Sequence, residues 1–114
     1  MDIKNGRKVI LTAEHHNSGL HTIDDWQQTK FILFEDGVLQ TIVFEGRKIR
    51  AHERTLREDE LMLITDNIKE FIYNTPDIDA CDGDTWVFEG PDYCFEYGYI
   101  NGSDLEFIAD ILER

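Results

Sequence analysis

The clearest pattern in the chain is a stripe of apolar residues at helical spacing between Thr55 and Pro76. Apolar side chains that recur every three or four residues fall on one side of a helix, which predicts a helix with one buried face. That face consists of Leu61, Ile64, Ile68, Phe71 and Ile72. Thr55 is followed three residues later by Glu58, a capping-box pattern, so the helix is predicted to begin there and to end near Asn74.

A second, shorter stretch near the C-terminus repeats this pattern. Ser103 with Glu106 three residues later predicts a capped start. The apolar residues that share one face of this segment are Leu105, Ile108, Ala109 and Leu112. We therefore expect a short closing helix.

Alternation of apolar and polar residues, which is typical of strands, dominates residues 27–54. Asp36–Gly37 and Glu45–Gly46 interrupt this alternation, and an acidic residue followed by Gly between such runs indicates a hairpin turn. The region is therefore predicted to be a meander. A further strand is expected from Lys8 to Glu14, and the connecting residues 15–26 are predicted to form a loop.

Residues 85–99 are predicted to form a second hairpin with Gly90–Pro91 as its turn, which places Glu89 opposite Asp92 and Phe88 opposite Tyr93. Side chains alternate between the two faces of a strand, so the hairpin separates into an aromatic face and a polar, acidic face. The aromatic face comprises Trp86, Phe88, Tyr93, Phe95, Tyr97 and Tyr99, and the other comprises Thr85, Val87, Glu89, Asp92, Cys94, Glu96 and Gly98. We expect the aromatic face to pack beneath a helix; the alternatives are a stacking platform and an uncovered face that joins two copies in a homodimer.

Together these elements predict an α+β fold in which an antiparallel meander of three to four strands is followed by a helix, a β-hairpin and a short C-terminal helix. At 114 residues the chain has the size of a single domain, residues 1–114. Its 41% apolar residues are enough for a core without metal or disulfide. No cofactor is expected.

The formal net charge of −13 is concentrated in the C-terminal part of the chain. Residues 1–69 carry 12 acids and 10 bases, whereas residues 70–114 carry 12 acids and one base, Arg114. Phosphate binding depends on Lys and Arg, so this charge disfavours nucleic acid and anionic membranes as direct ligands. A basic protein surface is the expected partner.

Two cysteines, Cys81 and Cys94, are too few for a disulfide framework, and whether they ever pair stays open. The first residues lack the apolar run of a signal peptide, and no stretch has the roughly eighteen apolar residues that cross a bilayer. These features favour a cytoplasmic protein with reduced thiols.

The most acidic stretch is DIDACDGDTWVFEGPD, residues 77–92, which holds six carboxylates and no Lys or Arg. It does not fit the calcium loop of an EF-hand, because Gly83 at the sixth position puts Ile78 and Ala80 where oxygen ligands are required. A solvated turn is the favoured interpretation, and a weak cation site of another kind is the alternative.

Signals for catalysis are weak. The three histidines of residues 15–21 and the two cysteines include no C-x-x-C pair and no helical H-x-x-x-H pair for zinc. A PD-(D/E)-x-K nuclease would need a lysine in the region after Lys69, where none occurs. Neither serine lies in a G-x-S-x-G elbow, and no glycine-rich phosphate loop is present. The sequence favours a protein that is not an enzyme, with a small metal-dependent enzyme as the weaker alternative.

The run DACDGDTW, followed by GYI and DLEFIADIL and preceded by an F-x-D-G hairpin, resembles small uncharacterised proteins of Firmicutes and their mobile elements. The resemblance covers the last third of the chain and, more loosely, the hairpin and helix before it, and it implies no activity. The acidic strand CFEYGYI departs from that group, where a basic residue is expected. In size and charge alone, the chain is similar to toxin-immunity proteins and to phage anti-defence proteins, including anti-CRISPR inhibitors.

The leading hypothesis is therefore a stoichiometric inhibitor whose acidic face occupies a basic groove on its target, such as the nucleic-acid channel of a nuclease or a basic surface of a toxin. The residues predicted to contact the partner are Asp79, Asp82, Asp84, Glu89, Asp92 and Glu96. The alternative is an acidic surface that only keeps the domain soluble. Segregation of charge favours the inhibitor, because an indifferent surface mixes both signs, as residues 1–69 do.

Overall fold

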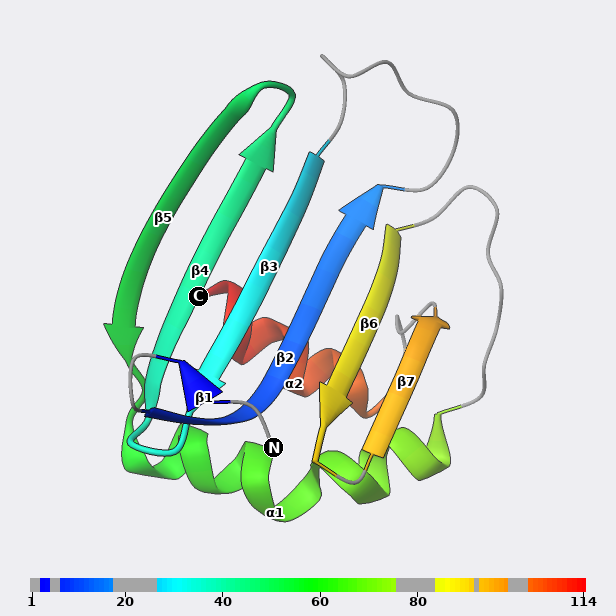
Figure 1. The fold of residues 1–114 in the computed structure, drawn as a ribbon. Coiled ribbons are helices and arrows are strands. Elements are labelled where there is room, and N and C mark those ends of the chain that lie inside the picture. Colours follow the sequence, from blue (N-terminus) through cyan, green and yellow to red (C-terminus); the bar gives the residue numbers. More distant parts are fainter. Residues whose placement is uncertain (1–2, 5–6, 18–26, 76–83, 92, 99–102) are drawn as a thin grey trace.

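The structure, a computed structural model, describes residues 3–4, 7–17, 27–75, 84–91, 93–98 and 103–114. Its elements confirm the predicted α+β class and the order of strands and helices (Figure 1). In chain order they are β1 (Ile3–Lys4), β2 (Arg7–Asn17), β3 (Gln27–Phe34), β4 (Val38–Glu45), β5 (Lys48–Thr55), α1 (Glu58–Asn74), β6 (Asp84–Gly90), β7 (Tyr93–Gly98) and α2 (Leu105–Glu113). The two-residue strand β1 adds to the predicted elements.

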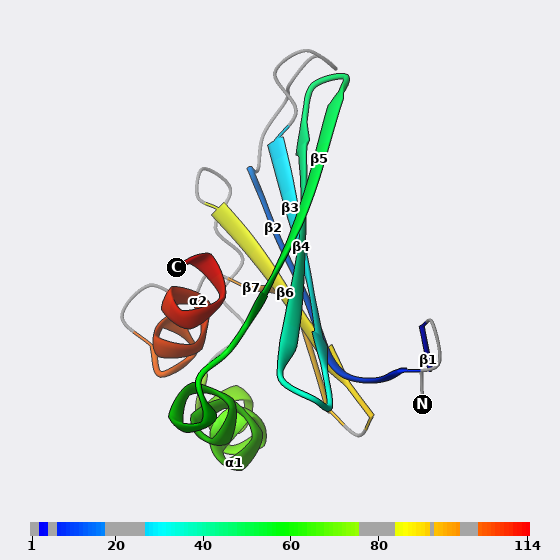
Figure 2. The same ribbon diagram turned by 90° about the vertical axis from the view of Figure 1, so that its left-hand side faces the viewer.

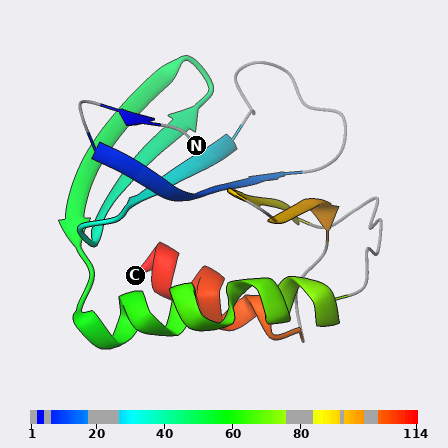
Figure 3. The same ribbon diagram turned by 60° about the horizontal axis from the view of Figure 1, so that its bottom comes forward.

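The strands form one antiparallel sheet in the order β5-β4-β3-β2-β6-β7, and β1 pairs with the start of β2. The C-terminal hairpin is therefore not a separate ribbon, because β6 pairs with β2 and continues the meander. Figure 2 shows both helices on one face of the sheet. Figure 3 shows α1 and α2 packed side by side below it.

The main core lies between the sheet and the helices. The face of the sheet that turns toward the helices, here called the helix-side face, contributes Leu11, Ala13, Phe31, Leu33, Leu39, Trp86, Phe88 and Phe95. The helices contribute Ile64, Ile68, Leu105, Ile108, Ala109, Ile111 and Leu112. The two predicted apolar stripes and the packing of the aromatic hairpin face beneath a helix are confirmed by this arrangement.

Successive side chains of a strand point alternately to the helix-side face and to the opposite face, here called the open face. The open face carries Thr12, Glu14, Lys30, Ile32, Gln40, Ile42, Val87 and Glu89. No described helix covers it (Figure 2). A small cluster of Val9, Ile32 and Phe34 is nevertheless buried there. A register shift between Val9 and Leu11, where β2 bends, places Val9 opposite Phe34 in this cluster.

Both predicted turns of the meander are confirmed by their glycines. Gly37 has φ 90° and Gly46 has φ 59°, conformations that residues with a side chain adopt at a cost. The Gly37 carbonyl also accepts a hydrogen bond from the Leu56 N–H at 2.9 Å. This bond fixes the chain as it leaves β5 and enters α1.

The predicted N-caps of the two helices are wrong, by two residues in α1 and by one in α2. Thr55 does not cap α1, because it is the last residue of β5 and pairs with Val38. The N-cap of α1 is Arg57, whose N–H donates to the Glu60 carboxylate at 3.1 Å. In α2 the N-cap is Asp104 rather than Ser103.

The predicted register of the C-terminal hairpin is also wrong. Gly90 pairs with Tyr93 and Phe88 with Phe95, so Glu89 lies opposite Cys94 and not opposite Asp92. Near the turn the partner strand slips by two residues, an even number, so Phe88, Tyr93 and Phe95 keep their predicted face. A register shift beyond Phe88 then brings Gly98, which was predicted on the polar face, opposite Trp86. Tyr97 and Tyr99 of the predicted aromatic face lie outside the described side chains.

The reason for this register is a contact of Tyr93 outside the hairpin. Its hydroxyl donates to the Ile10 carbonyl at 3.0 Å, and its ring lies across Gly90. A Cβ added at Gly90 would overlap that ring. The absence of a side chain at Gly90 thus lets Tyr93 reach across β6 to the bend in β2.

We expect Gly90→Ala to displace the Tyr93 ring and to break its bond to Ile10. A hydrogen bond of this kind is worth about 1 kcal/mol, so Tyr93→Phe should cost about that much, and Gly90→Ala more, because it also disturbs ring packing. Urea denaturation of the two variants measures both losses. In a Tyr93→Ala background, Gly90→Ala should cost almost nothing; an equal cost in both backgrounds would contradict the contact.

One buried carboxylate joins the edge of the sheet to both helices. Glu60 of α1 is only 7% exposed and accepts the Arg57 N–H. Arg114, after α2, donates to it at 3.0 Å, and an Arg54 nitrogen of β5 lies 4.0 Å away. Arg54 also donates to the Ile111 carbonyl near the end of α2. The group therefore fixes three elements at one point.

The pKa of Glu60 lies below its ordinary value of 4.5, mainly because its carboxylate accepts the Arg57 N–H. Burial acts in the opposite direction and raises the pKa. The hydrogen bond from Arg114 and the charges of Arg57 and Arg54 lower it further. A lowered pKa in the folded state stabilises the fold at pH values above the unfolded pKa. This contribution is lost as the pH falls below about 4.5 and through the folded pKa.

Glu60→Gln is accordingly expected to destabilise the protein by about 1.5 kcal/mol at pH 7, because a charge-assisted bond is lost while the exposed arginines stay solvated. Urea denaturation at several pH values checks this. The difference between wild type and variant should shrink below about pH 4.5. A difference that stays constant down to pH 2.5 would show that the charge of Glu60 is not its source.

Candidate functional site

The structure describes the side chain of only one of the six residues predicted to contact a partner. Asp79, Asp82 and Asp92 lie outside the described residues. Asp84 begins β6 and Glu96 lies within β7, but their side chains are outside the described part as well. The geometry of the predicted site therefore centres on Glu89.

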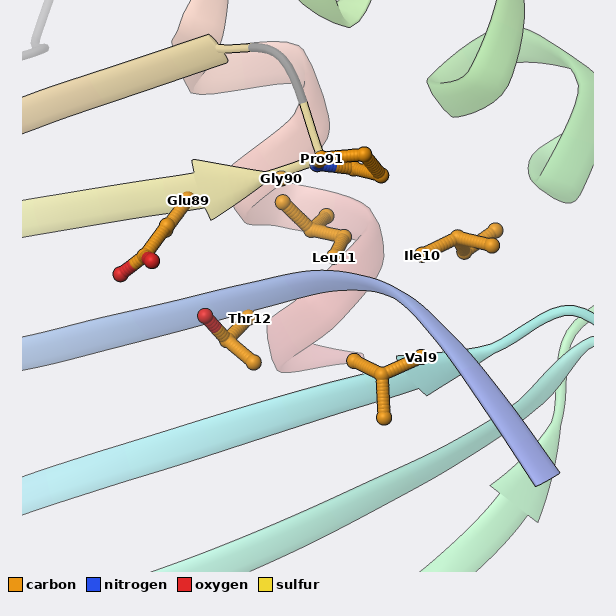
Figure 4. Close-up of a pocket in the computed structure, with 7 residues that line it drawn as sticks. All are labelled: Val9, Ile10, Leu11, Thr12, Glu89, Gly90 and Pro91. Carbon is orange, nitrogen blue, oxygen red and sulfur yellow. The ribbon is translucent and has the colours of Figure 1, made fainter. Parts of the chain in front are cut away.

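Glu89 is exposed on the open face, where β6 runs between β2 and β7. Its neighbours across the strands are Thr12 and Cys94, and Cys94 is also exposed. Glu89 lines a hollow of about 180 Å³ at the bend of β2, whose wall is completed by Val9, Ile10, Leu11, Thr12, Gly90 and Pro91 (Figure 4). This hollow opens where the pairing of β2 with β6 ends.

A second hollow, of about 240 Å³, lies on the other side of Glu89. Its lining combines two carboxylates, Glu14 and Glu89, with one ammonium group, Lys30, over an apolar floor that includes Ile32 and Val87. Such a surface can receive a long cationic side chain, whose stem packs on the floor while its charge meets a carboxylate. Neither His15 nor Glu60 lines either hollow.

The larger set of exposed carboxylates lies on the helices, which the sequence prediction did not single out. On α1 and α2 and at their N-termini, eight acidic side chains are exposed: Glu58, Asp59, Asp66, Glu70, Asp104, Glu106, Asp110 and Glu113. The exposed bases of the same segments are Arg57, Lys69 and Arg114. We call these eight carboxylates the acidic helix surface. It lies on the side of the sheet opposite to Glu89 (Figure 2).

Two pairs of these acids work against the helices that carry them, although Glu58, Asp59 and Glu106 in the first turns suit the helix dipole. Asp66 and Glu70 are four residues apart, as are Glu106 and Asp110, so like charges lie one turn apart on the same side of each helix. Each such pair destabilises a helix by roughly 0.2–0.5 kcal/mol. Neither helix has a base in its last turn, where a positive charge would suit the dipole.

Large apolar side chains are exposed among these charges. Tyr73 of α1 is 89% exposed and Phe107 of α2 is 62% exposed, and Met62 and Leu63 of α1 are exposed as well. Aromatic side chains are enriched among the residues that dominate binding energy at protein interfaces. The helix layer thus offers apolar anchors together with negative charge.

The predicted loop that begins at His15 is wrong, because β2 continues to Asn17 and pairs there with both β3 and β6. His15 stacks on Trp86, with ring centroids 4.4 Å apart and planes at 7°. Its Nδ1 lies 2.8 Å from a Glu113 oxygen. A carboxylate beside a histidine occurs in general bases, but this pair joins α2 to the sheet and borders no described hollow.

Among the described residues, no group of three His, Cys, Asp or Glu side chains is placed to hold a metal ion. None of the described helices is both long enough and apolar enough to span a bilayer. The acidic run at residues 77–83, considered above as a cation loop, lies outside the described residues.

The chain matches no protein-family model, and a search of curated proteins found no match.

The strain in the acidic helix surface can be tested directly. Glu70→Lys should raise the free energy of unfolding by roughly 0.5–1 kcal/mol, because it replaces a repulsive pair with Asp66 by an attractive one near a helix C-terminus. Urea denaturation at low salt measures the gain. The matched control is Glu58→Lys, the same change in the first turn of α1, which should lose roughly 0.3–1 kcal/mol. A loss in both variants would contradict the proposed repulsion.

Proposed function

We propose that the protein is an acidic protein-binding module that acts as a stoichiometric inhibitor, of the anti-defence or toxin-immunity kind, and docks on a basic, nucleic-acid-binding surface of its target. The observation that carries this proposal is the acidic helix surface. Eight exposed carboxylates there are interspersed with the exposed rings of Tyr73 and Phe107.

Exposed carboxylates together with exposed aromatic rings suit binding to a basic groove. Carboxylates pair with Arg and Lys, most strongly when an Arg guanidinium meets both oxygens. Aromatic side chains then supply contact area that excludes water around these pairs. A negative field also speeds the encounter with a positively charged partner, and salt weakens this effect.

The energetic cost supports a binding function over simple solubility. Solubility would be served equally well by acids and bases that alternate along each helix, an arrangement that also stabilises helices. The chain instead keeps like charges one turn apart in both helices. Residues that weaken a fold locally are expected where function requires them.

The six residues predicted from sequence form a second candidate contact around Glu89. Glu89 and Glu14 flank the hollow of about 240 Å³ on the open face, which suits the insertion of one Arg or Lys side chain. The two acidic regions lie on opposite faces of the sheet. A single flat partner surface would therefore contact one of them, and the experiment below separates them.

The test is capture of the target from an extract of the host organism with the full chain as bait, followed by measurement of association rates with the purified target. We expect a basic, nucleic-acid-binding protein whose activity falls at a one-to-one ratio. The triple variant Asp66→Lys, Glu70→Lys, Asp110→Lys should associate at least about tenfold more slowly at low salt, and this difference should shrink as salt rises.

A matched control is Glu35→Lys, Glu45→Lys, Glu53→Lys, which changes the net charge equally at the exposed turns and edge of the meander. This control should lose less than the helix variant. Glu89→Lys alone tests the open face: a larger loss there would move the contact to the predicted site. Equal effects of both triple variants would show that net charge, not a docking surface, governs binding.

A further inference from the structure

The edge strand β5 differs from the rest of this acidic molecule in charge and in regularity. It pairs with β4 through eight consecutive residue pairs without a register shift, from Val38 with Thr55 to Glu45 with Lys48. No described strand pairs with its outer side. Seven of its eight residues are exposed, and it contains neither Pro nor Gly. Its outer backbone groups are thus presented along an edge without a register shift.

The side chains of β5 separate by charge between its two faces. Residues 48, 50, 52 and 54 are Lys, Arg, His and Arg, and Arg54 binds the Ile111 carbonyl of α2, which places this row on the helix side. The alternate row is Ile49, Ala51, Glu53 and Thr55. Ile49 in that row is 67% exposed. The edge therefore has a cationic side and a side that is partly apolar.

This edge gathers much of the positive charge in the chain. Residues 47–57 contain five of the eleven Lys and Arg residues, although the net charge is −13. Figure 2 shows the upper part of the β4–β5 hairpin rising past both helices, so the row from Lys48 to His52 is not covered by the helix layer there. Lys48, Arg50 and His52 are all exposed.

Charges on an edge strand also prevent accidental pairing. Charged side chains are one of several such devices, and β5 has no bulge and no Pro and is not a very short strand. Two copies of β5 are poor partners for each other, because their cationic rows would face like charges across the strands. An incoming acidic strand would instead be attracted by this row, in competition with Glu45 of β4, which forms an ion pair with Arg50.

We propose that β5 binds an extended segment of another protein in which acidic and apolar residues alternate, and that this segment adds to the sheet as a further strand. Its backbone would pair with the outer edge of β5, its acidic row would meet Lys48, Arg50 and His52, and its apolar row would lie beside Ile49 and Ala51. The edge of β5 is separate from the acidic helix surface, so the binding proposed for one can be wrong while the binding proposed for the other holds.

The probe is a labelled eight-residue peptide in which Glu alternates with Val or Ile, added to the full chain and followed by fluorescence anisotropy. We expect saturable binding with slowed amide hydrogen exchange in β5 and unchanged exchange in β7. Peptides that lack the alternation, with the same residues in two blocks, or that carry N-methyl groups on alternate amides should bind at least about tenfold more weakly.

The variant Lys48→Glu, Arg50→Glu should weaken binding at least about tenfold, since two attractive cross-strand contacts become repulsive. The matched control Lys8→Glu, Lys69→Glu makes the same charge change at exposed residues away from the edge and should bind as wild type does. Thermal melts of both variants check that the fold is intact.

Four outcomes would overturn the proposal: no binding, equal binding of the block peptide, indifference to N-methylation, or equal loss in both charge variants. A single-stranded oligonucleotide that binds as well as the peptide, with the same dependence on Lys48 and Arg50, would show instead that the edge binds phosphate groups. Peptide-independent growth of particle size in light scattering would assign it to the acidic β7 edge of another copy.

Discussion

Burial of apolar side chains between one face of the sheet and two helices determines what the remaining surfaces can do. Phe88 of the sheet and Ile108 of α2 are completely buried in this layer. Because both helices occupy the same face, no described helix covers the open face, and no described strand pairs with the outer side of β5. The carboxylate of Glu60 then ties the helices to the sheet. Its arginine partners come from the edge strand β5, from the N-terminus of α1 and from the C-terminus of α2.

The sequence predicted those features that depend on neighbouring residues. The turns at Gly37 and Gly46 and the apolar stripes of both helices are local patterns, and all are confirmed. Features set by distant contacts were missed. Thr55 has the chemistry of an N-cap but is held in β5 by Val38, and the hairpin register follows from the reach of Tyr93 to Ile10. No local pattern contains those two contacts.

The positions of the acidic residues were also only partly predictable from the sequence. Acids concentrated in the last 45 residues were predicted to form one face. The chain instead places Glu89 on the open face and carries Glu106 and Asp110 on α2 at the opposite side of the sheet. Adjacency in sequence did not become adjacency in space, because α2 folds back below the hairpin that precedes it. The acids of α1, which belong mainly to the balanced part of the chain, join those of α2 instead.

The stack of His15 on Trp86 makes the core optically sensitive to the position of the C-terminal helix. Glu113 holds the imidazole from α2 while the indole belongs to β6. A ring stacked on an indole alters the emission of that indole, so a movement of α2 that displaces the imidazole would change the fluorescence of one of the two tryptophans. Tryptophan fluorescence would thus report whether α2 is packed against the sheet.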